Sequence, residues 1–419
     1  MVELFPICRS LTGPGVRQTL KMIQEIVPIH VFEEPSGNQV FDWVIPQEWS
    51  IDSAWIEDMS GNRVVDFANN NLHVMSYSQA VDKVMSRDEL ESHLYSLDDL
   101  PQAIPYTTSY YRDDWKFCLS KHQKDQLNEP RYRAVINSRH YQGSLTWAEV
   151  VIPGVLKDEI LFSCNICHPS LASNELSGPV LATYLARELL QTTPRYTYRF
   201  AFVPETIGCL TFLKHRLQHL KEFCKAGFVL TCLGDANEWS VVKTKSSDSL
   251  ADKAAMAVLR HRSPLREYPW FNRGSDERQY NFPTVNIPAV CLSRSKFGEY
   301  TQYHTSLDNL DFVTENSLYE SFQMLAELIE VLEANQIYRV TSIGEPFLSK
   351  KGLYPAHSTR FSGHGMKPLM NFLNACNGQR CLTEALEYSL APARLILDYL
   401  PSLIKTDVLK VVEHEGYKR

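Results

Sequence analysis

Long hydrophobic runs are missing from this 419-residue sequence. No apolar run approaches the roughly 20 residues that a bilayer-spanning helix needs, so we expect no membrane segment. The stretch from Met1 to Arg9 contains the acidic Glu3 and lacks the basic segment and apolar core of a secretory signal. These absences predict a cytoplasmic protein.

An excess of positive charge is missing as well. The chain carries 42 Lys and Arg against 49 Asp and Glu, a formal net charge of −7. Affinity for nucleic acids rests largely on Lys and Arg that neutralise phosphates. The charge balance therefore disfavours a nucleic acid as the partner of the whole chain.

Two common catalytic motifs are absent. The sequence has no G-x-S-x-G nucleophile elbow and no G-x-x-x-x-G-K-[ST] phosphate loop. The ten cysteines mostly sit in apolar runs, which is typical of reduced core residues rather than disulfides. Cys164 to His168 fits the C-x-x-C-H pattern of haem attachment, but the expected lack of export disfavours that interpretation.

The chain has the length and the patterning of two or three domains. From residue 131 onward, predicted strands alternate with predicted helices, which favours a mostly parallel sheet covered by helices on both faces. We expect a catalytic domain from residues 1–30 and 125–342, a β-rich insertion at 31–124, and a C-terminal winged helix at 350–419.

Four polar residues stand where predicted strands end. They are His168, Glu205, Asp235 and His304. Because active sites of α/β sheets form beyond the carboxyl ends of the strands, we expect these side chains to meet. Each one alone could equally be a helix cap or a loop residue. Together, two imidazoles and two carboxylates are typical of an open zinc site with a neighbouring general base.

Several segments resemble zinc aminopeptidases, the broad family that includes bacterial leucyl aminopeptidases, glutamate carboxypeptidases and glutaminyl cyclases. The order and spacing of the motifs agree over about residues 125–335. Cys167 to Gly178 resembles the family's first metal-histidine segment, and Pro204 to Gly208 resembles its Glu-Glu-x-Gly motif. Gly234-Asp235 resembles its later aspartate ligand, and Gly274 to Glu277 resembles its Ser-Asp-His loop. Tyr303 to Asp308 resembles its final Tyr-His-Thr-x-x-Asp motif.

A narrower resemblance covers essentially the whole chain. Arg9 to Gly13, the central β-rich insertion and Pro105 to Tyr111 look like a bacterial aminopeptidase-like group that is often linked to polysaccharide biosynthesis and ends in a winged helix. The resemblance implies a three-layer α/β zinc-exopeptidase domain of the phosphorylase/hydrolase-like class. It also implies a zinc cofactor and a small peptide or amino-acid amide as substrate.

Three departures from the family pattern change the expected metal site. Ser170 stands where the family orients its first histidine with Asp, Asn174 replaces the bridging aspartate, and Thr206 replaces the second glutamate. One zinc ion is therefore expected rather than two. The resemblance then implies His168, Asp235 and His304 as ligands, with Asn174 or Glu175 as further candidates. Glu205 becomes the general base or a fourth ligand.

Substrate contacts are predicted at four positions. Arg9 could bind a carboxylate or phosphate with its planar guanidinium, or form a surface ion pair. Asp276 and Glu277 could receive a substrate ammonium group, or form a solvated acidic loop. Tyr303 precedes the final metal histidine in the family motif. We expect the Tyr106–Tyr111 cluster to pack the insertion onto the catalytic domain.

The sequence thus predicts a zinc-dependent aminopeptidase-like hydrolase that cleaves an amide next to a free amino group. A single-zinc acyltransferase or cyclase remains an alternative, because glutaminyl cyclases in the broad family use one zinc without hydrolysing peptides. A vestigial scaffold or regulator acting through the winged helix is the other. The basic residues of the C-terminal unit are interspersed with acids, which favours packing or homo-oligomerisation over DNA binding.

Overall fold

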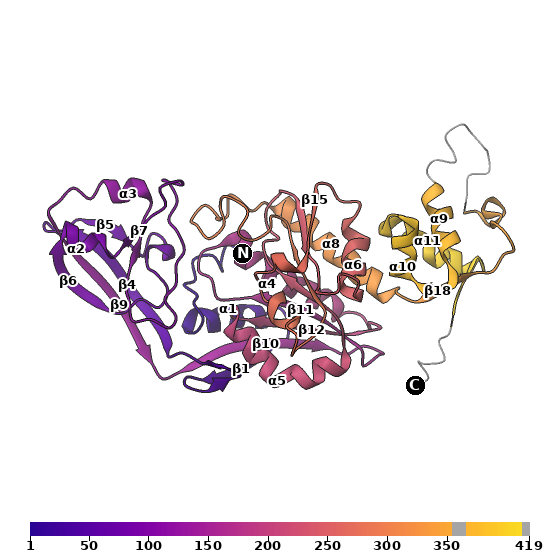
Figure 1. The fold of residues 1–419 in the computed structure, drawn as a ribbon, viewed down its shortest axis with the longest axis horizontal. Helices are drawn as coiled ribbons and strands as arrows, with labels where there is room; N and C mark the ends of the chain where they lie inside the picture. The colour runs from indigo at the N-terminus through magenta and orange to yellow at the C-terminus, as the bar shows by residue number, and fades with distance from the viewer. Residues whose placement is uncertain (354–365, 413–419) are drawn as a thin grey trace.

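The computed structural model describes residues 1–353 and 366–412. Figure 1 shows three units in a row, with an inserted β domain at one end, a central sheet with helices on both faces, and a small helical unit at the other end. Among the described residues, no helix is long and apolar enough to cross a membrane.

The central unit is an eight-stranded mixed sheet with the strand order β1-β10-β12-β11-β13-β16-β14-β15. Its middle strands β12, β11, β13 and β16 are parallel to one another. Every residue of β11 is buried, as expected for a strand covered on both faces. The bounds are β1 His30–Pro35, β10 Ser144–Ile152, β11 Glu159–Asn165, β12 Thr197–Val203, β13 Cys224–Leu230, β14 Trp239–Val242, β15 Leu265–Tyr268 and β16 Ala289–Ser293.

Helices bury apolar stripes on the two faces of this sheet. One core cluster joins the sheet to α1, α4, α6 and α8, and a second joins its other face to α5 and to Tyr280 of α7. The bounds are α1 Pro14–Gln24, α4 Ser177–Leu189, α5 Ile207–Phe223, α6 Leu250–Leu259, α7 Glu277–Tyr280 and α8 Glu315–Glu333. The result is the three-layer arrangement that the alternating pattern predicts.

The inserted domain is built on a four-stranded sheet of order β5-β4-β9-β6. Its two long strands, β4 (Glu48–Asp58) and β9 (Arg131–Tyr141), pair antiparallel along their length. The remaining elements are β2 Gln39–Val40, β3 Trp43–Val44, β5 Arg63–Asp66, η1 Asn71–His73, β6 Val81–Ser86, α2 Arg87–Glu91, β7 Leu94–Tyr95, β8 Phe117–Cys118 and α3 Lys121–Asp125.

The edges of this insertion differ from the expected 31–124. Strand β1 pairs with β10 and so belongs to the central sheet, whereas β9 belongs to the inserted sheet. The reason is a continuous connection: β9 ends at Tyr141, and after a short turn β10 begins at Ser144 and enters the central sheet. Strand propensity alone cannot say which of two sheets a strand joins.

The C-terminal unit has the elements of a winged helix. Strand β17 pairs with β18 and β19, so the unit begins ahead of the expected residue 350. Its apolar residues belong to the same core cluster as α6 and α8. Residues 354–365 and 413–419 of the expected range lie outside the described residues. The elements are β17 Ile337–Val340, η4 Leu348–Lys351, α9 Lys367–Ala375, β18 Asn377–Cys381, α10 Leu382–Ser389, α11 Ala393–Lys405 and β19 Leu409–Val411.

A buried cluster of charged side chains links strands β10, β12 and β11. Arg199 on β12 is 5% exposed, and its guanidinium binds Glu159 on β11 at 2.7 Å and Glu149 on β10 at 2.5 Å. Replacing Arg199 with Leu leaves two buried carboxylates without this cation. We expect the free energy of unfolding in urea to fall by about 3–5 kcal/mol.

The control for this change is Arg187→Leu on the exposed face of α4. It removes the same charge but leaves the core intact, so we expect a change within about 0.5 kcal/mol. If the two variants lost the same stability, the buried cluster would not be a strong tie between these strands.

Candidate active site

The candidate site lies beyond the carboxyl ends of the central parallel strands. His168 follows β11, Glu205 follows β12 and His304 follows β16. Because these strands run parallel in one sheet, with only β13 between β11 and β16, residues far apart in sequence come to one edge. In the structure, His168 Nε2 is 3.6 Å from Glu205 Oε2, and the ring centres of His168 and His304 are 5.2 Å apart.

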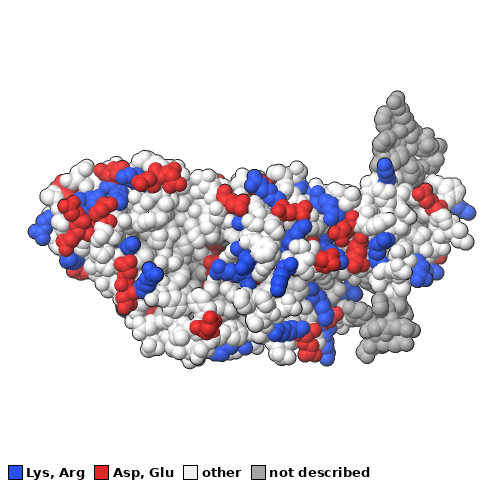
Figure 2. Space-filling model, viewed as in Figure 1, with Lys and Arg blue, Asp and Glu red and all other residues white. Residues whose placement is uncertain are grey.

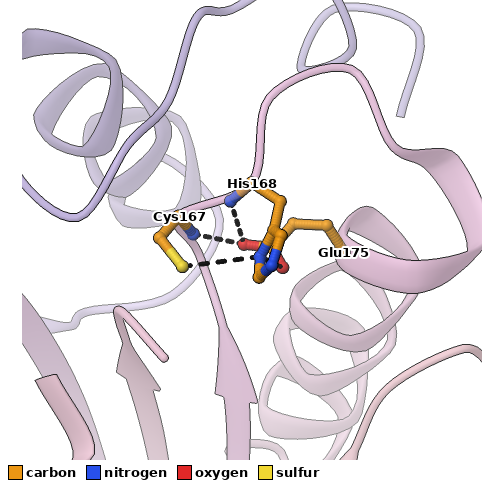
Figure 3. Close-up of side chains that lie close together, drawn as sticks. All are labelled: Cys167, His168 and Glu175. Atoms are coloured by element: carbon orange, nitrogen blue, oxygen red, sulfur yellow. Dashed lines mark hydrogen bonds and ion pairs between the residues drawn. The ribbon is translucent and has the colours of Figure 1, made fainter. Parts of the chain in front are cut away.

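Glu175 orients His168 (Figure 3). One carboxylate oxygen lies 2.7 Å from His168 Nδ1, and the other accepts the backbone N–H groups of Cys167 and His168. Burial opposes a charge on His168, yet the Glu175 carboxylate raises the pKa of His168 well above its usual value. An Nδ1–H donated to a carboxylate leaves Nε2 as the free atom, which is how metal-binding histidines are commonly fixed.

A π-helical turn, η2 (Ala172–Leu176), places Glu175 beneath the histidine. Asp308 holds this turn, because its two carboxylate oxygens accept the backbone N–H groups of Ser173 at 2.6 Å and Asn174 at 2.9 Å. Such turns occur often at functional sites. Asp308 is the last residue of the Tyr-His-Thr-x-x-Asp motif, so the motif joins the loop of His304 to the loop of His168.

Cys167 is packed against the same histidine. Its Sγ lies 3.5 Å from His168 Nδ1 and accepts the backbone N–H of Glu205 at 3.2 Å. Burial raises the pKa of the Cys167 thiol to about 11. The Nδ1 atom is already engaged by Glu175, so it cannot serve as the base for this thiol. Cys167 is therefore poorly suited to act as a nucleophile.

Glu205 is the member of this cluster that faces solvent. Its side chain is 28% exposed, against 6% for His168, and it lines a cleft of about 540 Å³. Burial raises the pKa of Glu205, while His168 and Arg278 oppose the rise. A carboxylate of raised pKa that contacts water is suited to general-base catalysis.

His304 completes the cluster from the opposite loop. Its ring stacks on Tyr303 at 3.9 Å, and Tyr106 from the inserted domain packs edge-on at 5.1 Å. Tyr106 also contacts the ring of His168 at 5.0 Å. Burial, together with His168, lowers the pKa of His304 to about 3, so its imidazole is neutral. Its buried Nε2 has no hydrogen-bond partner among the described residues.

Backbone strain gathers around these residues. Ser170, Thr206, Cys232 and His304 all have φ between 45° and 62°, in the left-handed region that non-glycine residues rarely adopt. Each costs of order 1–3 kcal/mol, which the surrounding structure must offset. At Thr206, Asp276 stabilises the conformation by accepting the Thr206 N–H at 2.9 Å.

The described side-chain partners of Asp235 are serine hydroxyls, and its predicted role as a ligand stays a prediction. Its side chain is fully buried, and its oxygens accept the hydroxyl groups of Ser173 at 3.0 Å and Ser295 at 2.8 Å. Asn174, the other candidate oxygen ligand, is also buried. Its Oδ1 atom is buried without a partner among the described residues, while its Nδ2 is 3.4 Å from Cys232 Sγ.

None of the four residues predicted to contact substrate lines the cleft described above. Arg9 is fully buried, and its Nε donates to the backbone carbonyl of His168 at 2.9 Å, so it stabilises the loop that carries His168. Asp276 and Glu277 are also fully buried. Glu277 accepts the N–H of Gly274 at 2.8 Å. Tyr303 contacts His304 rather than the cleft described above.

The cleft is formed jointly by the central and inserted domains. Tyr106 packs the inserted domain against the central domain as expected, but Tyr110 and Tyr111 line the cleft. The lining residues include Trp43, Tyr110, Tyr111, Arg112, Glu205 and Arg278.

Three roles were not predicted from the sequence, although the residues lie within or beside the recognised motifs. Glu175 orients His168, Asp308 anchors the loop of Glu175, and Arg278 is a cation of the cleft wall.

These residues offer nitrogen and oxygen donors of the kind that bind zinc. The His304 imidazole is neutral, His168 would have to release a proton to bind a metal, and the Asn174 oxygen is an unsatisfied acceptor among the described residues. Two imidazoles bound to one tetrahedral zinc through their Nε2 atoms would have ring centres about 5 Å apart, given Zn–N bonds near 2 Å. The observed 5.2 Å agrees with this value. A second ion would lack the carboxylates that Asn174 and Thr206 replace.

Comparisons with known proteins give the same fold. A family model described as a domain of unknown function, DUF4910, matches residues 1–335, and a winged helix-turn-helix model matches residues 336–411. A Clostridium acetobutylicum protein, provisionally described as a polysaccharide biosynthesis protein with aminopeptidase-like domain, is 40% identical over 98% of this chain and 95% of its own length.

Solved structures extend the likeness. The crystal structure of a provisionally described peptidase from Clostridium acetobutylicum has a TM-score of 0.89 at 39% identity, covering 98% of this chain and 94% of the other. A zinc aminopeptidase from Bacillus subtilis has a TM-score of 0.53 at 11% identity, covering 77% and 90%. An M28 peptidase precursor from Shewanella amazonensis has a TM-score of 0.54 at 10% identity, covering 78% and 90%.

The two distant neighbours share the fold, and they confirm the predicted α/β aminopeptidase-like architecture. The winged helix-turn-helix match confirms the predicted C-terminal unit. The DUF4910 model spans the inserted domain and the sheet that carries His168, Glu205 and His304. The chain belongs to the DUF4910 family, with an aminopeptidase-like fold followed by a winged helix-turn-helix domain.

Proposed function

We propose that this protein is a single-zinc hydrolase that cleaves an amide bond in the cleft between its central and inserted domains. The observation that carries the proposal is the meeting of His168, His304 and Glu205 at one sheet edge, with Glu205 exposed to the cleft. The zinc aminopeptidase from Bacillus subtilis shares this fold, which supports the choice of metal.

The ion would be held by His168 Nε2, His304 Nε2 and Asn174 Oδ1. Asn174 takes the place that the sequence assigned to Asp235, because serine hydroxyls already engage the Asp235 oxygens. Glu175 fixes the His168 tautomer through Nδ1. Zinc in such a site supplies Lewis acidity, which polarises an amide carbonyl and makes water more acidic.

Glu205 carries the proton in this scheme. As a carboxylate at the cleft wall it accepts a proton from the attacking water, and it then donates that proton to the leaving nitrogen. The products are a carboxylic acid and an amine. Cys167 holds the Glu205 loop by accepting its N–H, and Asp276 holds the next residue in the same way. These contacts keep the base in place between the two proton transfers.

The test is hydrolysis by metal-free and zinc-loaded protein. A panel of peptides, amino-acid amides and N-acyl amino acids is incubated with each form, and the released amine and any acyl-transfer product are measured separately. We expect amine release with zinc, its loss after chelation and its return on adding zinc. Amine release that persists without metal, or transfer products alone, would contradict the proposal.

We propose a packing role for the winged helix. Helix-turn-helix proteins read DNA with the N-terminal residues of the second helix. Here that end of α11 faces the central domain: Ala393 is 2% exposed, and Arg394 pairs with Glu330 of α8 at 2.7 Å. On the face shown in Figure 2, basic and acidic side chains are intermixed over the described part of this unit.

This packing predicts little affinity for DNA. We expect no salt-dependent mobility shift of random duplex DNA by the full chain, because Arg394 at the usual reading end is already paired with Glu330 and Asp398. The matched variant is Arg394→Ala, which removes one exposed cation and should leave this result unchanged. A shift that weakens with salt and with loss of Arg394 would show instead that the domain binds DNA.

A further inference from the structure

The cleft wall beside Glu205 carries an unpaired cation. Arg278 lines the cleft, and its guanidinium donates a hydrogen bond to a neutral group, Thr206 Oγ1, at 2.6 Å. Among the described residues no carboxylate forms an ion pair with it, although it lies near enough to Glu205, Asp276 and Glu277 to offset part of the rise in their pKa values. Its buried Nε has no hydrogen-bond partner among the described residues. A guanidinium at a cleft wall without an acidic partner is suited to an oxyanion from outside the protein.

The acids that could receive a substrate ammonium are withdrawn from the cleft. Asp276 and Glu277 are both 0% exposed and are not among the lining residues. One oxygen of each already accepts a backbone N–H, from Thr206 and from Gly274. An ammonium group that enters beside Glu205 would lie near the Arg278 guanidinium. The two positive charges would repel each other.

The outer part of the cleft adds two further cations and an aromatic wall. Arg112 has no ion pair among the described residues, and Lys116 reaches Asp114 only at 4.0 Å. Trp43 and Tyr111 lie 6.0 Å apart at the rim and are 37% and 53% exposed. The lining therefore has three cations and two carboxylates, Asp114 and Glu205, with rings on which a flat or ring-shaped group can stack.

We infer that the substrate is an anionic amide, with a carboxylate or phosphate bound by the Arg278 guanidinium close to the scissile bond. The inference rests on the proposed hydrolase function for the position of that bond. Thr206 Oγ1 accepts a hydrogen bond from the Arg278 guanidinium and so fixes its orientation. The strained Thr206 backbone therefore contributes to substrate recognition, because it positions this hydroxyl. A free amino group next to the bond, as an aminopeptidase requires, is not needed.

The direct test is anion binding to zinc-free protein, which does not depend on turnover. Succinate, inorganic phosphate and the uncharged succinamide are titrated calorimetrically into wild type, Arg278→Gln and Arg278→Lys. We expect succinate or phosphate to bind and succinamide not to bind. Which of the two anions binds more tightly distinguishes a carboxylate from a phosphate substrate. Arg278→Gln should weaken binding at least tenfold, and Arg278→Lys should fall between.

The matched control is Arg273→Gln, because Arg273 lies just ahead of α7, is exposed and stacks on Trp270. It should leave anion binding unchanged. Equal binding of succinamide, or equal loss in the two glutamine variants, would overturn the inference. Arg278→Lys keeps the charge and so serves if the glutamine variant fails to fold.

The failure of each proposal can be told apart. Anion binding through Arg278 without amide hydrolysis would remove the hydrolase function and leave the anion site. The opposite result is zinc-dependent hydrolysis of neutral, cationic and carboxylate-bearing amides at equal rates. That result would support the hydrolase function and contradict the anion site.

Discussion

Replacing Glu205 with glutamine is expected to lower kcat on any amide substrate by about 10²- to 10⁴-fold while zinc stays bound. The amide of glutamine has nearly the shape of the carboxylate but cannot accept the proton of the attacking water. Glu205 is the residue of the cluster that is both 28% exposed and at the cleft wall, so no neighbour can replace it. Steady-state kinetics and zinc content are measured on the same preparation.

The control is Glu222→Gln at the exposed end of α5, which makes the same chemical change away from the site. It should leave kcat and zinc unchanged. An unaltered rate in Glu205→Gln would remove Glu205 as the base. Loss of zinc in that variant would show instead that Glu205 is a metal ligand.

Replacing Glu175 with glutamine is expected to weaken zinc binding by about 10- to 100-fold. The glutamine oxygen can still accept the N–H groups of Cys167 and His168, so its NH₂ group would face His168 Nδ1. The Nδ1 atom must then accept, and the ring proton moves to Nε2, the atom that should bind the ion. Competition with a chromogenic chelator measures the affinity.

The matched variant is Glu188→Gln, on the exposed face of the helix that follows Glu175. Zinc affinity should not change there. Wild-type affinity in Glu175→Gln would mean that His168 needs no carboxylate to fix its tautomer, and the metal site would have to lie elsewhere. Circular dichroism of both variants distinguishes loss of the ion from loss of the fold.

The sequence was enough to place the site at a sheet edge because the rule behind it is local. Apolar strands such as β11 and β12 end at recognisable points, and parallel neighbours end on the same side. His168 and Glu205 could therefore be predicted to lie near each other, as the 3.6 Å approach shows. The alternation of strands and helices indicated the α/β fold, but it could not assign β1 and β9 to their sheets.

The roles of individual side chains could not be predicted in the same way, because each role depends on partners that are distant in the sequence. Asp235 stands after a strand like the others, but hydroxyl groups from residues 173 and 295 engage its oxygens. Arg9 looked like a surface or substrate residue, yet its guanidinium binds the carbonyl of His168, 159 positions away. Tyr106 reaches the two histidines only because the inserted domain folds over the sheet edge.

The central claim is one zinc ion held by the two histidines. Its most direct test is the metal content of protein purified without a metal-binding tag and equilibrated with zinc, compared with His168→Ala and His304→Ala. We predict about one zinc per wild-type chain and none in either variant, with the fold retained. Wild type without zinc, or zinc retained in both variants, would contradict the proposed site.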